Sequence, residues 1–520
     1  MKTTPSALLS LGVLFFIGTP CNAQTFNRRF DLLANGLSQT AFNVEVRDDS
    51  TYTVILGSAE EDSIGPDLYF GHYSIGVIFV DKYGNSTLQK RFTHPWHGIL
   101  PGWSNCCDTI ENGYIVGGTV DDTLGNLHVD LIAFDETGDT IWTHEFDPGN
   151  DNWYCQQVKS TIDGGFLLGG NKSWGNTIEG FVIKTDSIGE PQWTRTYNNP
   201  GGVGIASVAP LEDGGYLLGG GALEGVNGQR WLLRVDSLGN PVWPAKIWGS
   251  PFNDAGLSQC LLTSDGDVIA SGAMAYADDY DAMKPYLAKL DLQTGETIWE
   301  HVYGPQRYGT IGSSMKECTN TDLIMTGVTT DEDGYYIGFL LRTNADGDSL
   351  WMRDYYYADT LFSDGEGRLH DVIPTPDGGF IATGAAYYSI SMSYPPGYSQ
   401  DVWVLKVDSL GCVVPGCNGV TGITAQVTNL GEVLRLYPNP LSSSKGQLHV
   451  GIHLPGTFAT SGPLTLTVTT LEGKMVLQKQ VPTSIVEEVV LDVSSLAAGA
   501  YSLHLSDATR SLAGMKFVVE

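Results

Sequence analysis

The chain has 520 residues, of which 42% are apolar, and its 59 acidic and 28 basic side chains give a formal net charge of −31. This length exceeds what one ordinary hydrophobic core supports unless the core is built by repetition, and the apolar content excludes a disordered chain. The acidic excess repels phosphate backbones and anionic lipid headgroups, which disfavours nucleic acid and membrane surfaces as partners.

The first residues have the pattern of a secretory signal peptide. Lys2 gives a positive start, residues 7–17 are largely apolar, and Cys21-Asn22-Ala23 offers small residues to a signal peptidase. The apolar run is too short to span a bilayer, and no later segment reaches eighteen consecutive apolar residues. We therefore predict a signal peptide over residues 1–23, cleaved after Ala23, and no membrane insertion.

A short apolar motif ending in glycine recurs seven times, at intervals of 50 to 61 residues. The copies are TVILG (53–57), YIVGG (114–118), FLLGG (166–170), YLLGG (216–220), VIASG (268–272), LIMTG (323–327) and FIATG (380–384). A second apolar run and an acid–glycine turn follow each copy, as in FVIKTDSIGEPQW (181–193). Short apolar runs between Gly and Asp turns are typical of strands buried on both faces. Two hairpins per repeat predict a seven-bladed β-propeller.

Two further features of the repeat describe how the ring is held together. A tryptophan follows the acid–glycine turn in five repeats, and we expect it to pack between blades. The seventh repeat lacks its last strand, whereas TFNRRF (25–30) resembles WTRTY (193–197) of a complete repeat. We therefore predict that residues 25–31 complete the last blade. The five tryptophans are Trp142, Trp193, Trp243, Trp299 and Trp351.

The mature chain would hold an odd number of cysteines, so at least one thiol is free or pairs between chains. Cys412 and Cys417 flank a Pro-Gly turn and form the best candidate disulfide in an exported protein. The sequence leaves the pairing of the other cysteines open. These are Cys106, Cys107, Cys155, Cys260 and Cys318.

The composition changes after a Thr/Gly/Asn-rich linker, and residues 435–520 alternate Val, Leu and Thr. Such alternation predicts a small Ig-like β-sandwich. The predicted organisation is all-β: a signal peptide (1–23), a seven-bladed β-propeller (24–418), a linker (419–434) and the sandwich (435–520).

The C-terminal segment contains four short motifs, which comprise Tyr437, Pro438, Asn439 and Pro440, then Gly473 and Lys474, then Gly499 and Tyr501, and finally Lys516. In the order and spacing of these motifs the segment resembles the sorting domains of the type IX secretion system. The resemblance implies passage through the periplasm and recognition by an outer-membrane translocon. It also implies cleavage by a sorting protease, with the protein then secreted or held on the outer cell surface.

Local signatures of catalysis or of a cofactor are weak. LDLQTGETIW (290–299) resembles the docking repeat of quinoprotein propellers, but that motif is itself a blade-packing device. Asp331-Glu332-Asp333, Asp278-Asp279-Tyr280-Asp281 and residues 344–349 could hold calcium, although the last aligns with a hairpin turn of the other blades. His94 and His97 flank Pro95 without a third ligand. We predict no catalytic residue, no metal site and no cofactor, with calcium left open.

Aromatic side chains in the connections between strands suggest binding. Propellers carry these connections on one face, and flat aromatic rings there suit sugar rings or a protein partner, unless they only pack loops. The first hypothesis is a non-catalytic exported binding or adhesion protein for a glycan or a protein. The alternative is an extracellular carbohydrate-active enzyme, a hydrolase or lyase, with paired carboxylates in the central channel. The candidate ligand-binding residues are Trp96, Trp103, Trp153 and Trp174.

Overall fold

The computed structural model describes the chain from residue 24 to residue 520 with interruptions, and the predicted signal peptide lies outside the described residues. Every regular element in the described part is a β-strand, so the predicted all-β class is confirmed. The segments not described are residues 33–37, 60–72, 94–97, 104, 123–124, 147–150, 175–176, 225–226, 250–255, 276–281, 306, 358–365, 388–399, 414–425, 428–432, 442–445, 455–462, 471–474, 482–487 and 508–509.

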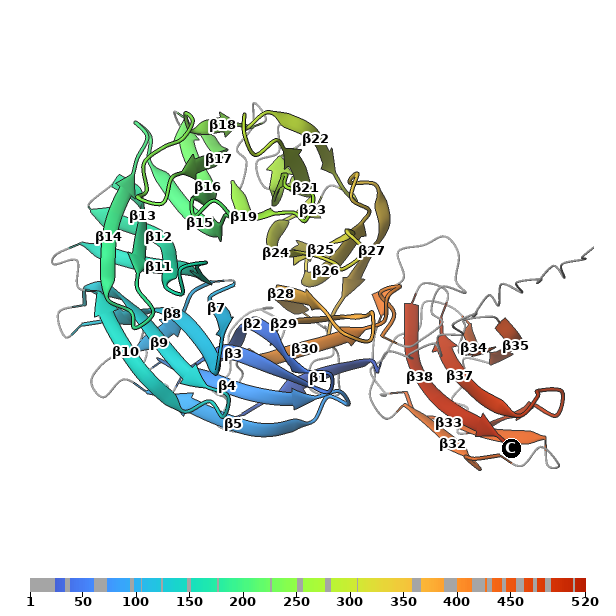
Figure 1. The fold of residues 1–520 in the computed structure, drawn as a ribbon. Coiled ribbons are helices and arrows are strands. Elements are labelled where there is room, and N and C mark those ends of the chain that lie inside the picture. Colours follow the sequence, from blue (N-terminus) through green and yellow to red (C-terminus); the bar gives the residue numbers. More distant parts are fainter. Residues whose placement is uncertain are drawn as a thin grey trace, which may run out of the picture.

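The described strands of residues 26–407 form seven antiparallel sheets arranged around a ring, which is a β-propeller (Figure 1). Blade 1 comprises β2 (Gln39–Asp48), β3 (Thr51–Ala59), β4 (Tyr73–Asp81) and β5 (Ser86–Phe92). Blade 2 comprises β6 (Ile99–Pro101), β7 (Cys107–Ile110), β8 (Gly113–Asp121), β9 (Leu127–Asp135) and β10 (Thr140–Phe146). Blade 3 comprises β11 (Asn152–Ser160), β12 (Phe166–Trp174), β13 (Thr177–Thr185) and β14 (Pro191–Tyr197).

The other blades repeat this order from the inner strand outward. Blade 4 comprises β15 (Val203–Pro210), β16 (Tyr216–Glu224), β17 (Asn227–Val235) and β18 (Lys246–Trp248). Blade 5 comprises β19 (Leu257–Leu262), β20 (Val268–Ala275), β21 (Ala282–Leu290), β22 (Thr297–Val302) and β23 (Arg307–Tyr308). Blade 6 comprises β24 (Ile311–Glu317), β25 (Leu323–Thr330), β26 (Tyr336–Thr343) and β27 (Ser349–Tyr355). Blade 7 comprises β28 (Glu366–Pro374), β29 (Phe380–Tyr387), β30 (Asp401–Val407) and β1 (Phe26–Phe30).

The ring closes through β1, which adds the outer strand of blade 7. This strand pairs antiparallel with β30, so that Phe26 lies opposite Lys406, and in Figure 1 the blue β1 runs beside the orange β30. Asn27 Oδ1 accepts a hydrogen bond of 2.6 Å from Trp403 Nε1 of β30. The two ends of the propeller segment are therefore joined in one sheet, as predicted.

The repeated Asp-Gly-Gly turn is a tight hairpin between the first and second strands of a blade. In blade 3, Thr161 N donates to Gly165 O at 2.9 Å, and Gly164 has a positive φ of 81°. A Cβ atom on Gly165 would lie 2.1 Å from the carbonyl oxygen of Thr185. The first glycine is needed for the turn and the second for the close approach of the third strand.

Each predicted docking tryptophan packs on the turn glycine of the next blade. A Cβ atom on Gly189 would lie 2.8 Å from the ring of Trp142, and a Cβ atom on Gly347 would lie 2.9 Å from the ring of Trp299. Trp193 adds a hydrogen bond of 3.1 Å from its Nε1 to Ser237 O. These contacts confirm that the tryptophans join neighbouring blades.

The C-terminal segment forms two sheets. One has the order β32-β33-β36, and in the other β31 pairs with β27 of blade 6 and with β38. A single apolar cluster that includes Leu448, Leu466 and Phe517 is buried in this segment, consistent with the predicted sandwich. The strands are β31 (Gln426–Val427), β32 (Leu434–Tyr437), β33 (Gln447–Ile452), β34 (Leu464–Thr470), β35 (Met475–Val481), β36 (Glu488–Asp492), β37 (Gly499–Ser506) and β38 (Arg510–Val519).

Truncation of Phe26 tests the ring closure. Phe26 is 5% exposed and packs in the cluster between blades 7 and 1. We expect Phe26→Ala to lower the free energy of unfolding by about 3–5 kcal/mol, measured by urea denaturation followed through tryptophan fluorescence. Ile188→Ala, at a turn position that is 63% exposed, is the control and should change stability by less than about 0.5 kcal/mol. Equal effects of the two substitutions would contradict the closure.

Candidate functional site

The propeller has two faces that differ in their connections. One face, the loop face, carries the connections between blades, such as residues 198–202, and those between the second and third strands of a blade. The opposite face, the turn face, carries the Asp-Gly-Gly hairpins and the acid–glycine turns. Each inner strand therefore begins at the loop face and ends at the turn face.

The four candidate tryptophans occupy different environments. Trp103 is 53% exposed, whereas Trp153 stacks on Phe181 with 4.5 Å between ring centroids and packs against the core between blades 2 and 3. Trp174 ends β12, and its side chain is not described; Trp96 lies outside the described residues. Among the described side chains, Trp103 is thus the candidate that presents a free aromatic surface.

Trp103 lies at the loop-face end of the inner strands, against two bulge residues. Its ring is 5.8 Å from the ring of Phe42 in blade 1 and 5.4 Å from that of His370 in blade 7, the latter in an edge-on arrangement. Phe42 and His370 are themselves 5.4 Å apart and buried. Three blades therefore supply one aromatic cluster beside the central channel.

The inner strand of blade 2 is interrupted between β6 and β7, and the described residues of this insertion include Trp103 and Asn105. Asn105, which is 1% exposed and has a positive φ of 50°, donates from Nδ2 to Gln259 Oε1 of blade 5 at 3.4 Å. Its Oδ1 accepts a hydrogen bond from Lys316 Nζ of blade 6. The insertion thus ties blade 2 to the opposite side of the ring.

Below the insertion, polar side chains of the inner strands link each blade to the next. In five blades such a side chain accepts a hydrogen bond from a backbone N–H of the following blade, and a β-bulge precedes each of them. We call these bonds the blade clasps. They are Val44 N to Asp371 Oδ2 (2.9 Å), Cys107 N to Asn43 Oδ1 (3.2 Å), Val208 N to Gln157 Oε1 (2.6 Å), Cys260 N to Ser207 Oγ (3.1 Å) and Met315 N to Gln259 Oε1 (2.5 Å).

The two other blades vary this theme. In blade 6, Ser314 Oγ donates to Asp371 Oδ1 at 2.6 Å, so both oxygens of that carboxylate are engaged. In blade 2 the corresponding position is Cys106, whose backbone carbonyl pairs with Gly117 N as the inner strand resumes. The clasp residues are at most 4% exposed, which makes the channel wall a ring of hydrogen-bonded amides and hydroxyls.

A second layer of channel residues, two positions closer to the turn face, is charged. Glu45, Asp108, Lys159 and Lys316 are half-buried there. Asp108 Oδ2 accepts from Ser160 N at 2.7 Å, and Lys159 Nζ lies 3.8 Å from Asp108 Oδ1.

The charges of this layer are balanced unevenly. Burial raises the pKa of Glu45 to about 7, while the nearby lysines Lys316 and Lys159 oppose the shift and Asp371 adds to it. With Asp371 of the adjoining clasp, the three carboxyl groups Glu45, Asp108 and Asp371 would otherwise exceed the ammonium groups of Lys159 and Lys316 and leave a net negative charge inside the protein. Partial protonation of Glu45 near neutral pH reduces that imbalance, because burial disfavours an uncompensated charge.

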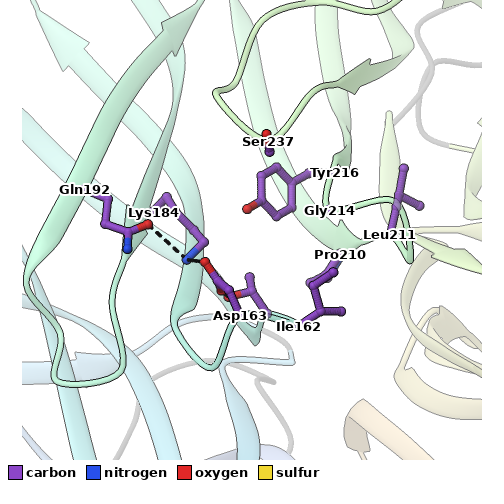
Figure 2. Close-up of a pocket in the computed structure, with 10 residues that line it drawn as sticks. Ile162, Asp163, Lys184, Gln192, Pro210, Leu211, Gly214, Tyr216 and Ser237 are labelled. Carbon is purple, nitrogen blue, oxygen red and sulfur yellow. Dashed lines mark hydrogen bonds and ion pairs between the residues drawn. The ribbon is translucent and has the colours of Figure 1, made fainter.

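A cavity between two blades lies on the turn face, away from the residues of this channel layer. Figure 2 shows this cavity of about 160 Å³ between blades 3 and 4, where Lys184 Nζ contacts Asp163 Oδ2 at 2.9 Å and Gln192 Oε1 at 3.4 Å. Equivalent pairs occur in other blades, including Asp377 with Lys406 at 2.9 Å. This repetition indicates that the pair braces each hairpin.

The acidic loops and cysteines show no metal-ligand geometry in the described part of the chain. No group of three or more His, Cys, Asp or Glu side chains there could hold a metal ion. Asp331 Oδ1 accepts from Asp333 N and Tyr335 N, and Asn344 Oδ1 accepts from Asp348 N, so both segments are hairpin turns. Residues 278–281, His94 and His97 lie outside the described residues.

The cysteines of the propeller core carry free thiols. Cys106, Cys107, Cys155 and Cys260 are buried and Cys318 is half-buried. Cys412 is buried, but its predicted partner Cys417 lies outside the described residues, so that disulfide stays a prediction. No described helix is long and apolar enough to cross a membrane.

The sorting motifs hold the end of the chain against the C-terminal sheets. Asn439 Nδ2 donates to Lys516 O at 3.0 Å, and Asn439 Oδ1 accepts from Val518 N at 3.1 Å. Tyr501 donates to Ala497 O at 2.8 Å. The Asn439 and Tyr501 motifs are thus placed by hydrogen bonds to the backbone. Gly473 and Lys474 lie outside the described residues, whereas Tyr437, Pro438, Pro440 and Gly499 lie within them.

The C-terminal domain has a known family. Residues 435–520 match the family model of the secretion system C-terminal sorting domain, which confirms the predicted type IX sorting domain. The chain is therefore a β-propeller protein that carries such a domain. This domain indicates secretion to the cell surface or the medium and interaction with the type IX secretion machinery.

Solved structures resemble the propeller at low identity. Sqt1 from Chaetomium thermophilum has 10% identity over 70% of this chain and 85% of that chain, with a TM-score of 0.38. The β-propeller domain of the Trilobed protease from Pyrococcus furiosus has 7% identity over 74% and 97%, with a TM-score of 0.37. The GH43_1 enzyme from Xanthomonas citri complexed with xylotriose has 10% identity over 58% and 94%, with a TM-score of 0.29. A search of curated proteins finds no significant match. Because these likenesses are so distant, they do not identify a ligand or an activity for this chain.

Removal of one blade clasp tests its contribution to stability. Gln157→Leu leaves the buried N–H of Val208 without its acceptor, so we expect a loss of about 1–3 kcal/mol in the free energy of unfolding. The control is Gln156→Leu, because the neighbouring Gln156 side chain makes no hydrogen bond to a described residue. Urea denaturation of both variants measures the difference. If the free energy of unfolding fell no more in Gln157→Leu than in Gln156→Leu, the proposed role of the clasp would be wrong.

The raised pKa of Glu45 predicts a pH dependence of stability. Between about pH 4.5 and pH 7 the unfolded carboxyl group is ionised while the folded one keeps its proton, so stability falls as the pH rises. The decline is on the order of 3 kcal/mol. Glu45→Gln should remove it, so that the Tm of the variant, measured by calorimetry, exceeds that of the parent chain at pH 8 by more than at pH 5. The exposed Glu332→Gln serves as control, and parallel pH profiles for Glu45→Gln and the parent chain would refute the assignment.

Proposed function

We propose that this chain is a non-catalytic binding protein, delivered by type IX secretion, whose propeller holds a glycan on the loop face at Trp103. The observation that carries the proposal is the position of Trp103, which is 53% exposed yet fixed edge-on to a buried ring of blade 7. A rigid aromatic face with one side free is suited to stacking on a sugar ring, because little conformational entropy is lost on binding.

The state of the channel carboxylates supports a binding role over hydrolysis. Asp371 accepts hydrogen bonds at both oxygens, and Asp108 is held by Ser160 N and faces Lys159. The insertion of blade 2 also lies between the loop face and this layer. A glycosidase needs one carboxyl group as acid and another free to act as base or nucleophile at the substrate.

The export route belongs to the same proposal. The signal peptide would direct the chain to the periplasm with cleavage after Ala23, and the translocon and sorting protease would then read residues 435–520. The Cys412–Cys417 disulfide would end the propeller segment (24–418) ahead of the linker (419–434). An oxidising compartment on this route permits that bond.

A carbohydrate-active enzyme is the second candidate, and Glu45 favours it. A carboxyl group with a pKa of about 7 beside other carboxylates has the properties of a general acid. This reading requires that substrate reach the charged layer of the channel. Release of sugar from a polysaccharide would distinguish this enzyme from the proposed binding protein.

Affinity electrophoresis of the purified full chain through gels that contain neutral polysaccharides tests the binding proposal. We expect retardation in at least one gel and its loss in Trp103→Ala, because the stacking surface is removed. The control is Tyr83→Ala, since Tyr83 is a 56% exposed aromatic residue in a hairpin turn of the turn face.

Three results would count against the binding proposal. Retention of Trp103→Ala equal to the parent chain would show that the ligand lies elsewhere. Absence of retardation in every gel would leave a protein partner. Release of sugar from the gels, lost in Glu45→Gln, would establish the enzyme instead.

A further inference from the structure

An arginine without a carboxylate partner lies two residues before His370, a member of the Trp103 cluster. Arg368 of β28 places its guanidinium 4.2 Å from the ring centre of Tyr336 and 5.4 Å from that of Tyr387. The guanidinium group of Arg368 makes no hydrogen bond or ion pair with a described residue, and its Nε atom is buried without a partner. By contrast, Arg307 on the same face bonds Asp354 at 2.7 Å.

This environment prepares Arg368 to bind an anion. The two tyrosine rings hold the guanidinium plane, so little side-chain entropy is lost when a ligand arrives. A carboxylate can take two parallel N–H donors from such a group. Because both tyrosines and Arg368 are only half-buried, the site is open to solvent.

His370 connects this arginine to Trp103. Its ring touches that of Trp103, and it follows Arg368 by two residues on β28. Burial, and then the positive charge of Arg368, lower the pKa of His370 to about 3, so the imidazole is neutral at physiological pH. Its Nδ1 has no partner among the described residues although the residue is 3% exposed. His370 is therefore an uncharged, buried packing link between Trp103 and the strand that carries Arg368.

We infer that the glycan bound at Trp103 carries an acidic sugar, whose carboxylate pairs with Arg368. This inference rests on the proposed function and names the class of its ligand. An exposed aromatic face and an unpaired guanidinium match the apolar face of a sugar ring and the carboxylate of a hexuronate in the same oligosaccharide.

The overall charge of the chain limits the form of this ligand. With a net charge of −31, the protein repels a long polyanion. At physiological ionic strength charges beyond about 8 Å are largely screened, whereas a contact with Arg368 is not. The site is therefore suited to a short acidic oligosaccharide or to a single acidic sugar within a mostly neutral chain.

Isothermal titration calorimetry of the purified full chain tests the inference. The ligands are hexamers of galacturonate, mannuronate and guluronate, and each is compared with its methyl ester, which keeps the sugar rings and removes the charge. Hexaglutamate supplies carboxylates without a sugar ring. The variants are Arg368→Gln and, as a matched control, Arg195→Gln, because Arg195 also lies over an aromatic ring, 6.0 Å from Trp193, but on an outer strand.

The inference expects at least one acid hexamer to bind about tenfold or more tightly than its ester. Arg368→Gln should remove that difference and leave the ester's affinity unchanged, whereas Arg195→Gln should bind like the parent chain. Equal binding of acid and ester, equal binding of hexaglutamate, no effect of Arg368→Gln, or no binding of any acid hexamer would overturn it.

Failure of the inference can be distinguished from failure of the proposed function. If neutral polysaccharides retard the parent chain but not Trp103→Ala while acid hexamers show no preference, the glycan site stands and the acidic class is wrong. If neither neutral nor acidic sugars bind, both proposals fall.

Discussion

The propeller depends on hydrogen bonds in which a backbone N–H group of one inner strand finds its acceptor in the preceding blade. These groups are buried around the channel, where an unpaired donor costs about 1–3 kcal/mol. A β-bulge in each clasping strand re-aims one polar side chain so that it accepts that hydrogen bond, as Gln157 does for Val208. The clasps therefore specify the approach of neighbouring blades at the channel, and the docking tryptophans repeat this function at the outer strands.

The aromatic cluster at the loop face combines one blade that departs from this rule with two blades that follow it. Blade 2 has Cys106 at the clasp position and inserts residues before it, and the insertion carries both Trp103 and Asn105 into the centre of the ring. Blade 7 carries Asp371 in its clasp, preceded by His370 in the bulge. The clasps supply rigidity, and the insertion of blade 2 together with the bulge of blade 7 supplies the aromatic cluster of Trp103 and His370.

Much of the fold follows from the sequence because the repeat encodes it locally. The Asp-Gly-Gly turns require glycine at specific positions, and the match of TFNRRF to WTRTY predicted the strand that closes the ring. The residues that face the channel could not be predicted in this way. A bulge in each clasping strand reverses which side chains point to which face, and no residue type in the sequence marks the bulge. The difference between Trp103 and Trp153 is likewise tertiary, since the ring stacked on Trp153 belongs to another strand.

The electrostatics of the molecule follow the same division between ring and centre. Asp-rich hairpins on the turn face hold their own lysines and arginines, as Asp163 holds Lys184, so most basic groups there are already engaged. The channel layer neutralises itself through Lys159, Lys316 and the partly protonated Glu45. Arg368 differs from these basic groups because its guanidinium has no carboxylate partner among the described residues. Screening by salt limits its electrostatic attraction for a ligand to short distances. If the loop face binds a glycan as proposed, its selectivity must therefore come from contacts made within a few ångströms and not from long-range attraction.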